Sequence, residues 1–155
     1  MRISARTDYA LRAMAELADT PDRPRKAEDI AGRQDIPGRF LFVVLGDLRQ
    51  ARLVVSVRGP DGGYTLARPP AEISLADIIR AMDGPLVSVR DLKLTGLAYQ
   101  GAAAPLPDVW RAVRTSIRQV LEGTTLADLT AGTLPDLVRE RASAYNEDVR
   151  TYPHG

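Results

Sequence analysis

The chain has 155 residues, of which 45% are hydrophobic, enough for one compact core or for a small domain with an assembly element. It contains no cysteine, which excludes disulfides, thiolate nucleophiles, zinc fingers and thiolate-held iron–sulfur clusters. No stretch of about 18 apolar residues is present and Met1 leads into a charged amphipathic segment, so we expect a cytoplasmic protein without membrane contact.

The charge is distributed unevenly along the chain, although the net charge is only +1. Residues 1–70 carry 12 Arg and Lys against 9 Asp and Glu, whereas the remainder carries 9 against 11. This mild asymmetry is compatible with an N-terminal part that faces DNA and a neutral assembly part. Almost all cations are Arg, which suits bidentate contacts to phosphate or guanine, but a GC-rich genome would produce the same bias.

Three helices are predicted in the first 50 residues. Apolar residues recur at helical spacing over 4–19, and a short second helix is marked by Ala27, Ile30 and Ala31. A tight connection over 32–36 then leads to Pro37, a favourable first residue of a helix. In the third helix four residues fall at positions i, i+3, i+4 and i+7 and should be buried: Leu41, Val44, Leu45 and Leu48.

A β-hairpin and a fourth helix follow. Residues 53–57 are β-branched and extended, residues 58–63 are dense in turn residues, and Tyr64 begins a second extended segment. Ser74 with Asp77 then forms a capping box for a helix that ends at Gly84-Pro85. This order predicts a mainly α fold with a small β-hairpin wing, a winged helix-turn-helix unit over residues 1–84.

The second half is expected to serve assembly. Residues 85–106 read as an irregular connecting loop, 107–145 as a long dimerisation helix with C-terminal helices, and 146–155 as a frayed tail. Thr124 is the expected cap of a short helix through Leu129, and the last helix is expected near 135–145. A coiled-coil-like stripe from Asp108 to Glu122 provides the predicted dimer interface: Val109, Trp110, Val113, Ile117, Val120 and Leu121.

The third helix and the hairpin carry the predicted DNA contacts. Arg39 can form a bidentate contact with guanine, and Phe42 can touch a thymine methyl group or pack in a core or an interface. Arg58, held among turn glycines, suits a narrow minor groove, although an ordinary glycine-rich turn remains an alternative. The candidate DNA-binding residues are Arg2, Ser4, Tyr9, Gly38, Arg39, Phe40, Phe42, Arg49, Arg58, Gly59 and Gly62.

Neither catalysis nor metal binding finds support in the sequence. The single histidine, His154, lies in the tail, and no serine can be placed beside a base. The glycine-rich turn lacks the Gly-Lys-Ser/Thr ending of a phosphate loop and precedes a strand. We therefore expect no enzyme, no metal and no cofactor.

Three segments resemble the IscR/NsrR family of bacterial regulators: Met-Arg-Ile-Ser followed six residues later by Leu-Arg-Ala, residues 27–36, and the hairpin sequence from Leu53 to Pro70. Weaker similarity extends through Trp110-Arg111 and residues 125–129. The resemblance implies a homodimer on a palindromic operator, usually a repressor, with the third helix in the major groove. It also implies that Arg58 is the wing arginine that enters the minor groove.

The resemblance breaks at the cluster site that many relatives have. Where those relatives carry three cysteines, this chain has Leu92, Ala98 and Ala104, and where some have a fourth, it has Pro107. Asp8, the position of a partner-subunit ligand in others, is expected to make a helix-start or interhelical polar contact instead. Cluster sensing is therefore excluded by ligand chemistry.

The loop over 86–106 and the recognition helix leave functional alternatives open. The loop could shape a pocket for a small-molecule effector, contact a protein effector, or only connect; its few polar residues, Arg90, Asp91, Lys93 and Tyr99, favour the last two. Cluster-type relatives often have Tyr and a polar or acidic residue at the Phe40 and Phe42 positions, so an operator cannot be transferred. A protein-interaction module that has lost specific DNA recognition is the alternative function.

Overall fold

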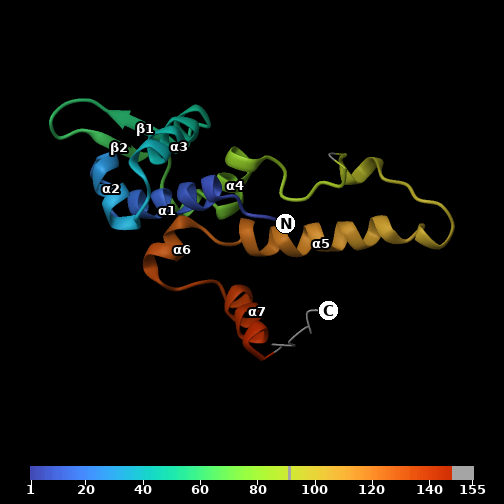
Figure 1. Ribbon diagram of the computed structural model, residues 1–155. Helices are drawn as coiled ribbons and strands as arrows, with labels where there is room; N and C mark the ends of the chain where they lie inside the picture. The colour runs from blue at the N-terminus through green and yellow to red at the C-terminus, as the bar shows by residue number, and fades with distance from the viewer. Residues whose placement is uncertain (91, 148–155) are drawn as a thin grey trace, which may run out of the picture.

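The computed structural model describes residues 1–90 and 92–147, which form seven α-helices, one antiparallel hairpin and three short 3-10 turns. Helices α1 to α4 and the hairpin gather at one end, while α5 extends away from them (Figure 1). The predicted fold class is confirmed. The bounds are α1 (Ala5–Asp19), α2 (Ala27–Gln34), α3 (Gly38–Gln50), β1 (Val54–Val57), β2 (Gly63–Leu66), α4 (Leu75–Asp83), α5 (Leu106–Glu122), α6 (Leu126–Ala131) and α7 (Asp136–Glu147).

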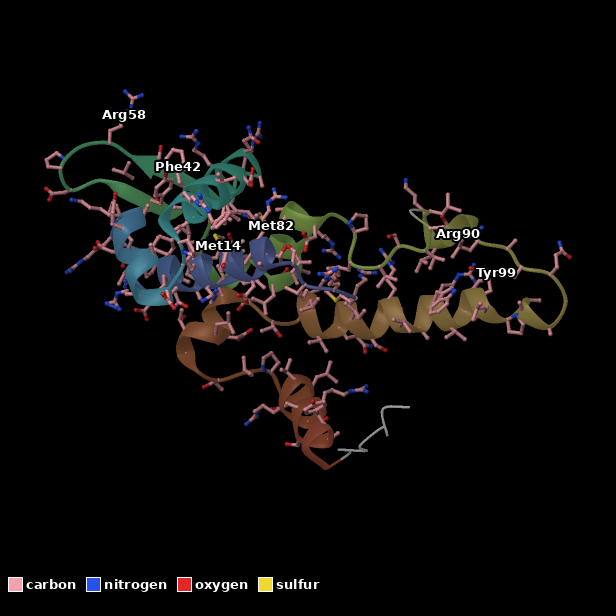
Figure 2. The ribbon with its side chains drawn as sticks, in the orientation of Figure 1. Met14, Phe42, Arg58, Met82, Arg90 and Tyr99 are labelled. Carbon is pink, nitrogen blue, oxygen red and sulfur yellow. The ribbon has the colours of Figure 1, made fainter. Side chains whose placement is uncertain are left out.

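The core lies between α1 and the helices packed around it. Met14 of α1 and Met82 of α4 are both buried there (Figure 2), together with the four predicted apolar residues of α3. Leu126 of α6 is also fully buried in this core, and backbone hydrogen bonds join Leu126 to Ile73 and Leu75 to Thr124. Because of these contacts α6, which the sequence prediction grouped with the dimerisation helix in residues 107–145, packs with the N-terminal helices.

Two helix boundaries differ from the sequence prediction. Helix α2 continues to Gln34 instead of ending before Gly32, and the chain turns at Asp35, whose left-handed backbone (φ 50°) directs its N–H to the Ala31 carbonyl. The cap of α6 is Thr125, which forms a capping box with Asp128. Thr124 is buried and donates its hydroxyl to the Val120 carbonyl at 2.7 Å, so it satisfies a carbonyl in the last turn of α5.

The connection between α4 and α5 is irregular, as expected, apart from 3-10 turns at Leu94–Gly96 and Gly101–Ala103. It runs out along α5 and returns to the start of that helix (Figure 1). Helix α5 begins at Leu106, two residues before the predicted start. No helix in the described part of the chain combines the length and the apolar character that a bilayer crossing requires.

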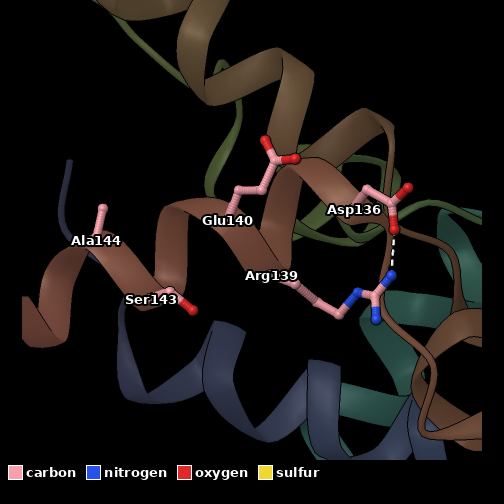
Figure 3. A pocket seen from close by; sticks show the side chains of 5 residues that line it. All are labelled: Asp136, Arg139, Glu140, Ser143 and Ala144. Atoms are coloured by element: carbon pink, nitrogen blue, oxygen red, sulfur yellow. Dashed lines mark hydrogen bonds and ion pairs between the residues drawn. The ribbon is translucent and has the colours of Figure 1, made fainter.

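Helix α7 projects from the rest of the molecule and carries an open polar surface. A shallow hollow lies along it, lined by residues of this one helix, with Arg139 ion-paired to Asp136 (Figure 3). The last helix was expected over 135–145, and it extends to Glu147. The frayed tail predicted for residues 146–155 lies outside the described residues from 148 onward.

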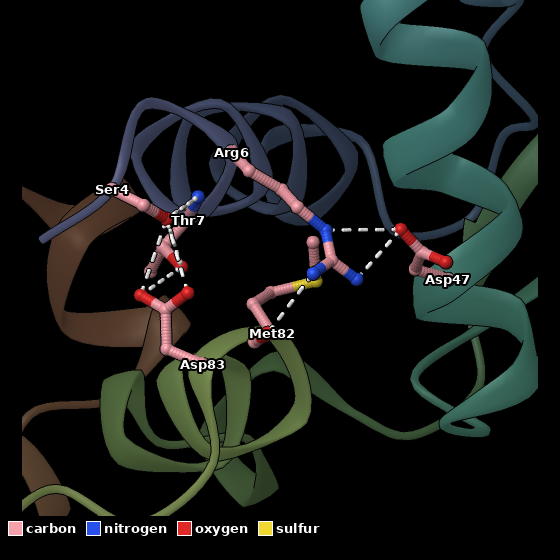
Figure 4. A network of polar contacts seen from close by, with 6 residues as sticks. All are labelled: Ser4, Arg6, Thr7, Asp47, Met82 and Asp83. Carbon is pink, nitrogen blue, oxygen red and sulfur yellow. Dashed lines mark hydrogen bonds and ion pairs between the residues drawn. The ribbon is translucent and has the colours of Figure 1, made fainter.

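Polar contacts fix α1 against α4 and α3 (Figure 4). Ser4 and Thr7 both donate hydroxyl hydrogen bonds to the Asp83 carboxylate, Thr7 at 2.5 Å and Ser4 at 3.0 Å. The Thr7 bond, followed by those from Ser4, holds the pKa of Asp83 below its usual value. Arg6 bridges the Asp47 carboxylate, at 2.9 Å, and the Met82 carbonyl. The network therefore links the start of α1 to the end of α4 and to α3.

A second set of contacts fixes the base of α5 on α4. Ile117 and Leu121 of α5 pack against Ala76, Ile79 and Leu86, which form a small apolar cluster. Beside this cluster the Glu122 carboxylate accepts hydrogen bonds from Arg118 and Arg80, which lower the pKa of Glu122 to about 2. Only the C-terminal half of α5 is held in this way, and the N-terminal half contacts the returning loop.

Candidate DNA-binding interface

Helix α3 presents an unusual outer face. Its inner stripe is buried as predicted, while Arg39 and Arg49 are exposed as predicted. Phe42 is 67% exposed and Val43 is 58% exposed. The exposure of Phe42 rules out packing in this chain's own core, one of the alternatives left open by the sequence. The Phe42 side chain is therefore available for contact with DNA or with another molecule.

The first turn of α3 is arranged around Arg39. Its guanidinium lies over the Phe40 ring, 4.9 Å from the ring centre, a cation–π contact that limits the freedom of the long side chain. Phe40 itself is 48% exposed. Gly38 begins the helix with open space around the position of a side chain. This end of α3 therefore presents one cation, one aromatic edge and accessible backbone.

Two glycines shape the wing, one because a side chain would overlap the backbone and the other because of its backbone conformation. A Cβ on Gly62 would lie 2.1 Å from the Val57 carbonyl oxygen, and Gly59 has φ +108°, a conformation that L residues rarely adopt. The Gly62 N–H closes the turn on the Gly59 carbonyl at 3.0 Å. Arg58 is exposed at this turn and makes no hydrogen bond or ion pair with the described residues. Arg58 and Phe42 lie on the same side of the molecule (Figure 2).

The base of the wing is attached to the segment before α2 by a contact that the sequence prediction missed. Arg25 and Tyr64 exchange backbone hydrogen bonds of 2.9 and 2.8 Å. A Cβ on Gly63 would lie 2.3 Å from the Arg25 carbonyl oxygen, so glycine permits this approach. The Arg25 side chain is itself bound by Glu16 and Thr20. The sequence signal for this contact was Gly63, a second glycine directly after Gly62 at the start of β2.

The predicted contacts on α1 are placed differently. Ser4 caps α1, accepting from the Thr7 N–H at 3.1 Å, and also donates to Asp83, so its hydroxyl has partners within the chain and its contact with DNA stays a prediction. Tyr9 is half-buried against the core with the Arg12 guanidinium 5.1 Å from its ring centre. Arg2 is exposed. The structure thus gathers the α3 and wing residues and gives Ser4 and Tyr9 structural contacts.

The predicted dimer stripe differs between the two halves of α5. Val109 and Val113 are 50% and 40% exposed, whereas Ile117 and Leu121 contact their own chain's α4 region. Val120 is half-buried. The indole Nε1 of Trp110 is enclosed and has no acceptor among the described residues. The exposed valines are therefore the part of the stripe still available to another molecule.

Several hollows lie beside α5, among them one at the loop and one at the chain's N-terminal residues. One of about 320 Å³ lies between α5 and the loop, where Lys93 and Arg114 are among its lining residues. An apolar groove of about 440 Å³ lies between the N-terminal residues Met1 and Ile3 and the helices α5 and α7. Neither hollow contains a convergent set of acids or bases that would perform chemistry.

Comparisons with known proteins identify the architecture. Residues 3–132 match the Rrf2 family, described as an iron-dependent transcriptional regulator. The protein Rv1287 of Mycobacterium tuberculosis, whose name classes it among HTH-type transcriptional regulators, is 51% identical over 152 residues, 97% of this chain and 94% of that protein. CymR of Bacillus subtilis is 34% identical over 134 residues, 86% of this chain and 92% of that protein.

Solved structures agree with this match. The structure of CymR, the global cysteine regulator of B. subtilis, superposes with a TM-score of 0.74 at 33% identity, covering 86% of this chain and 98% of CymR. T. potens IscR superposes with a TM-score of 0.66 at 31% identity, covering 100% of this chain and 94% of IscR.

The iron in the family's description has no suitable ligands in this chain. There is no cysteine, and the positions that the resemblance assigns to cluster ligands hold Leu92, Ala98 and Ala104. The carboxylate of Asp8 pairs with Arg12 at 3.0 Å within the first turns of α1, the helix-start position expected for it. Among the described residues no group of three or more His, Asp or Glu side chains is placed to bind a metal ion. The residues present therefore do not fit an iron or iron–sulfur centre.

Proposed function

The chain belongs to the Rrf2 family of DNA-binding transcription regulators, and from this premise we propose that it binds a palindromic operator as a homodimer and represses transcription there without a cluster. No catalytic activity is part of the proposal, and its site of action is the cytoplasm, where the chromosome lies. Repression follows when a bound dimer occupies DNA that the polymerase needs.

One observation carries the proposal: Phe42, on the exposed face of α3, and Arg58 of the wing lie on the same side of the N-terminal unit (Figure 2). An α-helix is about 10–12 Å wide with its side chains, which matches the major groove of about 12 Å. With α3 in the major groove, the wing reaches the neighbouring minor groove, where a narrow groove attracts arginine. Arg39 and Arg49 then face bases or phosphates.

The dimer is proposed to form along α5. Its 17 residues give roughly 26 Å of helix, and Val109 with Val113 exposes an apolar strip on the N-terminal half, beyond the part of α5 that packs on α4. An isolated helix cannot bury such a strip, and a second copy related by a two-fold axis offers the same strip in return. Two α3 helices carried on one α5 pair would read a palindrome.

An effector would act through the loop beside this helix. The hollow lined by Lys93 and Arg114 lies between the loop and α5. A small molecule or a protein bound at residues 86–106 would therefore contact the proposed dimerisation helix and could change the spacing of the two recognition helices. The effector would thus bind at the place in the fold where cluster-containing relatives hold their iron–sulfur cluster.

The test is capture of genomic DNA fragments by the purified protein at near-physiological salt, followed by sequencing of the retained DNA. Enrichment of a palindrome, with a mass in solution of two chains, is the expected result. Retention of DNA without sequence preference would contradict the proposal.

A second candidate function, a winged-helix interaction module, is favoured by the exposure of Phe40, Phe42 and Val43 on one helix. Such an apolar surface can bind a protein. It predicts a stable protein complex and weak DNA affinity that varies with salt and not with sequence. The same capture experiment separates the two candidates.

A further inference from the structure

The outer face of α3 is mostly apolar where regulators usually carry polar side chains. From Gly38 to Val44, Arg39 is the one charged residue, and Phe42 and Val43 are 67% and 58% exposed. Residues three and four apart share a helix face, so the two side chains border the position of Gly46 in the next turn. Exposed apolar side chains gathered on one face mark a binding surface.

We propose that Phe42 and Val43 read thymine methyl groups in the major groove, so that the operator half-site is specified largely by apolar contacts to T·A pairs. The inference rests on the proposed function and names the bases that it uses. The major groove is where the methyl group of thymine is displayed, and contact with an apolar side chain is how proteins distinguish it.

The charges around this face favour DNA over a protein as its occupant. Arg39 and Arg49 lie before and after the apolar residues on α3, Arg58 lies on the wing, and all three are exposed. The acid on α3, Asp47, is bound by Arg6 at 2.9 Å, so its charge is neutralised locally. An apolar centre within a cationic border complements base edges flanked by two phosphate backbones.

Gly46 is a second, independent observation. It lies inside α3, and a Cβ there would meet nothing within 4 Å, so nothing within this chain requires glycine at this position. Glycine inside a helix is less stable than alanine. Gly46 lies one helical turn after Phe42 and Val43. The lack of a side chain there is explained if the helix backbone must approach the bases closely. This gives the proposal a prediction that does not depend on removing an aromatic side chain.

The first test replaces thymine by deoxyuridine, one position at a time, in the operator found by fragment capture. Uracil keeps every hydrogen-bonding group and lacks only the methyl. At the contacted thymines we expect affinity to fall about fourfold per methyl, the equivalent of one buried CH₂ group, and about fifteenfold when both half-sites are changed. Thymines elsewhere in the same duplex serve as the internal control.

The second test repeats the series with Phe42→Ala and Val43→Ala, with Leu129→Ala on α6 as the matched apolar control. The two α3 variants should bind the thymine operator more weakly and lose most of their sensitivity to deoxyuridine at one position each. Leu129→Ala should retain the full wild-type sensitivity. Phe42 and Val43 are exposed, so both variants should keep the circular dichroism and mass of the parent.

The third test is Gly46→Ala, with Gly32→Ala of α2 as the control, since its Cβ would also meet nothing within 4 Å. Both changes should raise Tm by about 2–4 °C, because alanine favours a helix. Only Gly46→Ala should weaken operator binding, by about tenfold, because its methyl must fit against the bases.

The outcomes separate this inference from the proposed function. If no palindrome is captured, the proposed function fails and the inference fails with it. If a palindrome is bound but deoxyuridine has no effect, the inference alone is overturned. It is also overturned if Phe42→Ala and Val43→Ala lose as much affinity on deoxyuridine as the parent does, since the methyl would then act through DNA shape.

Discussion

The DNA-binding unit (residues 1–84) and the α5 arm (residues 85–122) differ in how much of their surface they bury themselves. The unit has a continuous core in which α1, α3 and α4 contribute fully buried side chains. In α5, by contrast, Pro107 is the one residue that is buried, and Val109 and Val113 remain exposed. Hydrophobic burial drives folding, so the unit, with Leu126 of α6 added to its core, buries its apolar side chains within the chain, whereas the arm leaves an apolar strip for another surface.

This difference indicates which property each kind of substitution should change. Changes on the arm should act on assembly, and changes on the wing should act on DNA binding. Changes in the contacts between helices of the unit should act on stability.

The largest effect is expected from Val113→Glu. In a two-fold dimer this change buries two uncompensated charges, each costing about 3–5 kcal/mol, so the protein should become monomeric at micromolar concentration and lose operator binding. Sedimentation velocity measures the mass. Thr115→Glu, an exposed position on another face of α5, is the control and should stay dimeric. A dimeric Val113→Glu protein would move the interface away from α5.

Arg58→Ala should reduce operator affinity by about 100-fold and leave the dimer intact, since each of the two wing arginines contributes on the order of 1–3 kcal/mol. The slope of log K against log salt should fall by about 2 for the two lost cations. Fluorescence anisotropy over a salt series measures both. Arg141→Ala, on exposed α7, should change neither value. Unchanged affinity and slope for Arg58→Ala would remove the wing from the interface.

Gly62→Ala should reproduce the DNA-binding defect of Arg58→Ala without removing a charge. Its methyl would overlap the Val57 carbonyl, so the turn must open at a cost of about 1–3 kcal/mol, and Arg58 moves with it. Asp61→Ala, in the same turn and exposed, should bind at least as well as the parent. If Gly62→Ala bound the operator normally, the shape of the wing would not matter for recognition.

The smallest effect is expected from Asp83→Asn, which weakens the hydrogen bonds from Thr7 and Ser4. We expect a loss of about 1 kcal/mol or less at pH 7, because the carboxylate is exposed and screened. Urea unfolding at several pH values measures this, with the exposed Asp22→Asn as the control.

The pH dependence of that loss has a definite sign. The folded pKa of Asp83 lies below its ordinary value, so the ionised carboxylate stabilises the protein above the unfolded pKa of about 3.9 and this contribution disappears as pH falls through the folded pKa. The difference between the parent and Asp83→Asn should therefore shrink below about pH 4. A difference that persists at pH 2 would show that packing, and not the charge, is responsible.

The sequence predicted the elements that depend on local patterns. Helical spacing in α3 predicted its four buried residues, the Ser74 cap was placed correctly, and the turn residues predicted the hairpin. The α6 cap was misplaced by one residue because two threonines are adjacent, and only the three-dimensional path of the chain buries Thr124 and leaves Thr125 to cap.

The tertiary structure decided which side chains share a surface. Local pattern carries no information about contacts between distant segments, so it did not show that Arg25 supports the wing, that Leu126 belongs to the N-terminal core, or that Asp83 engages Ser4. It could not decide whether Phe42 is inside or outside, because an aromatic residue beside a buried stripe suits either environment. The sequence alone excluded a thiolate-held cluster. A cluster needs cysteine ligands, and the chain has none, whatever its fold.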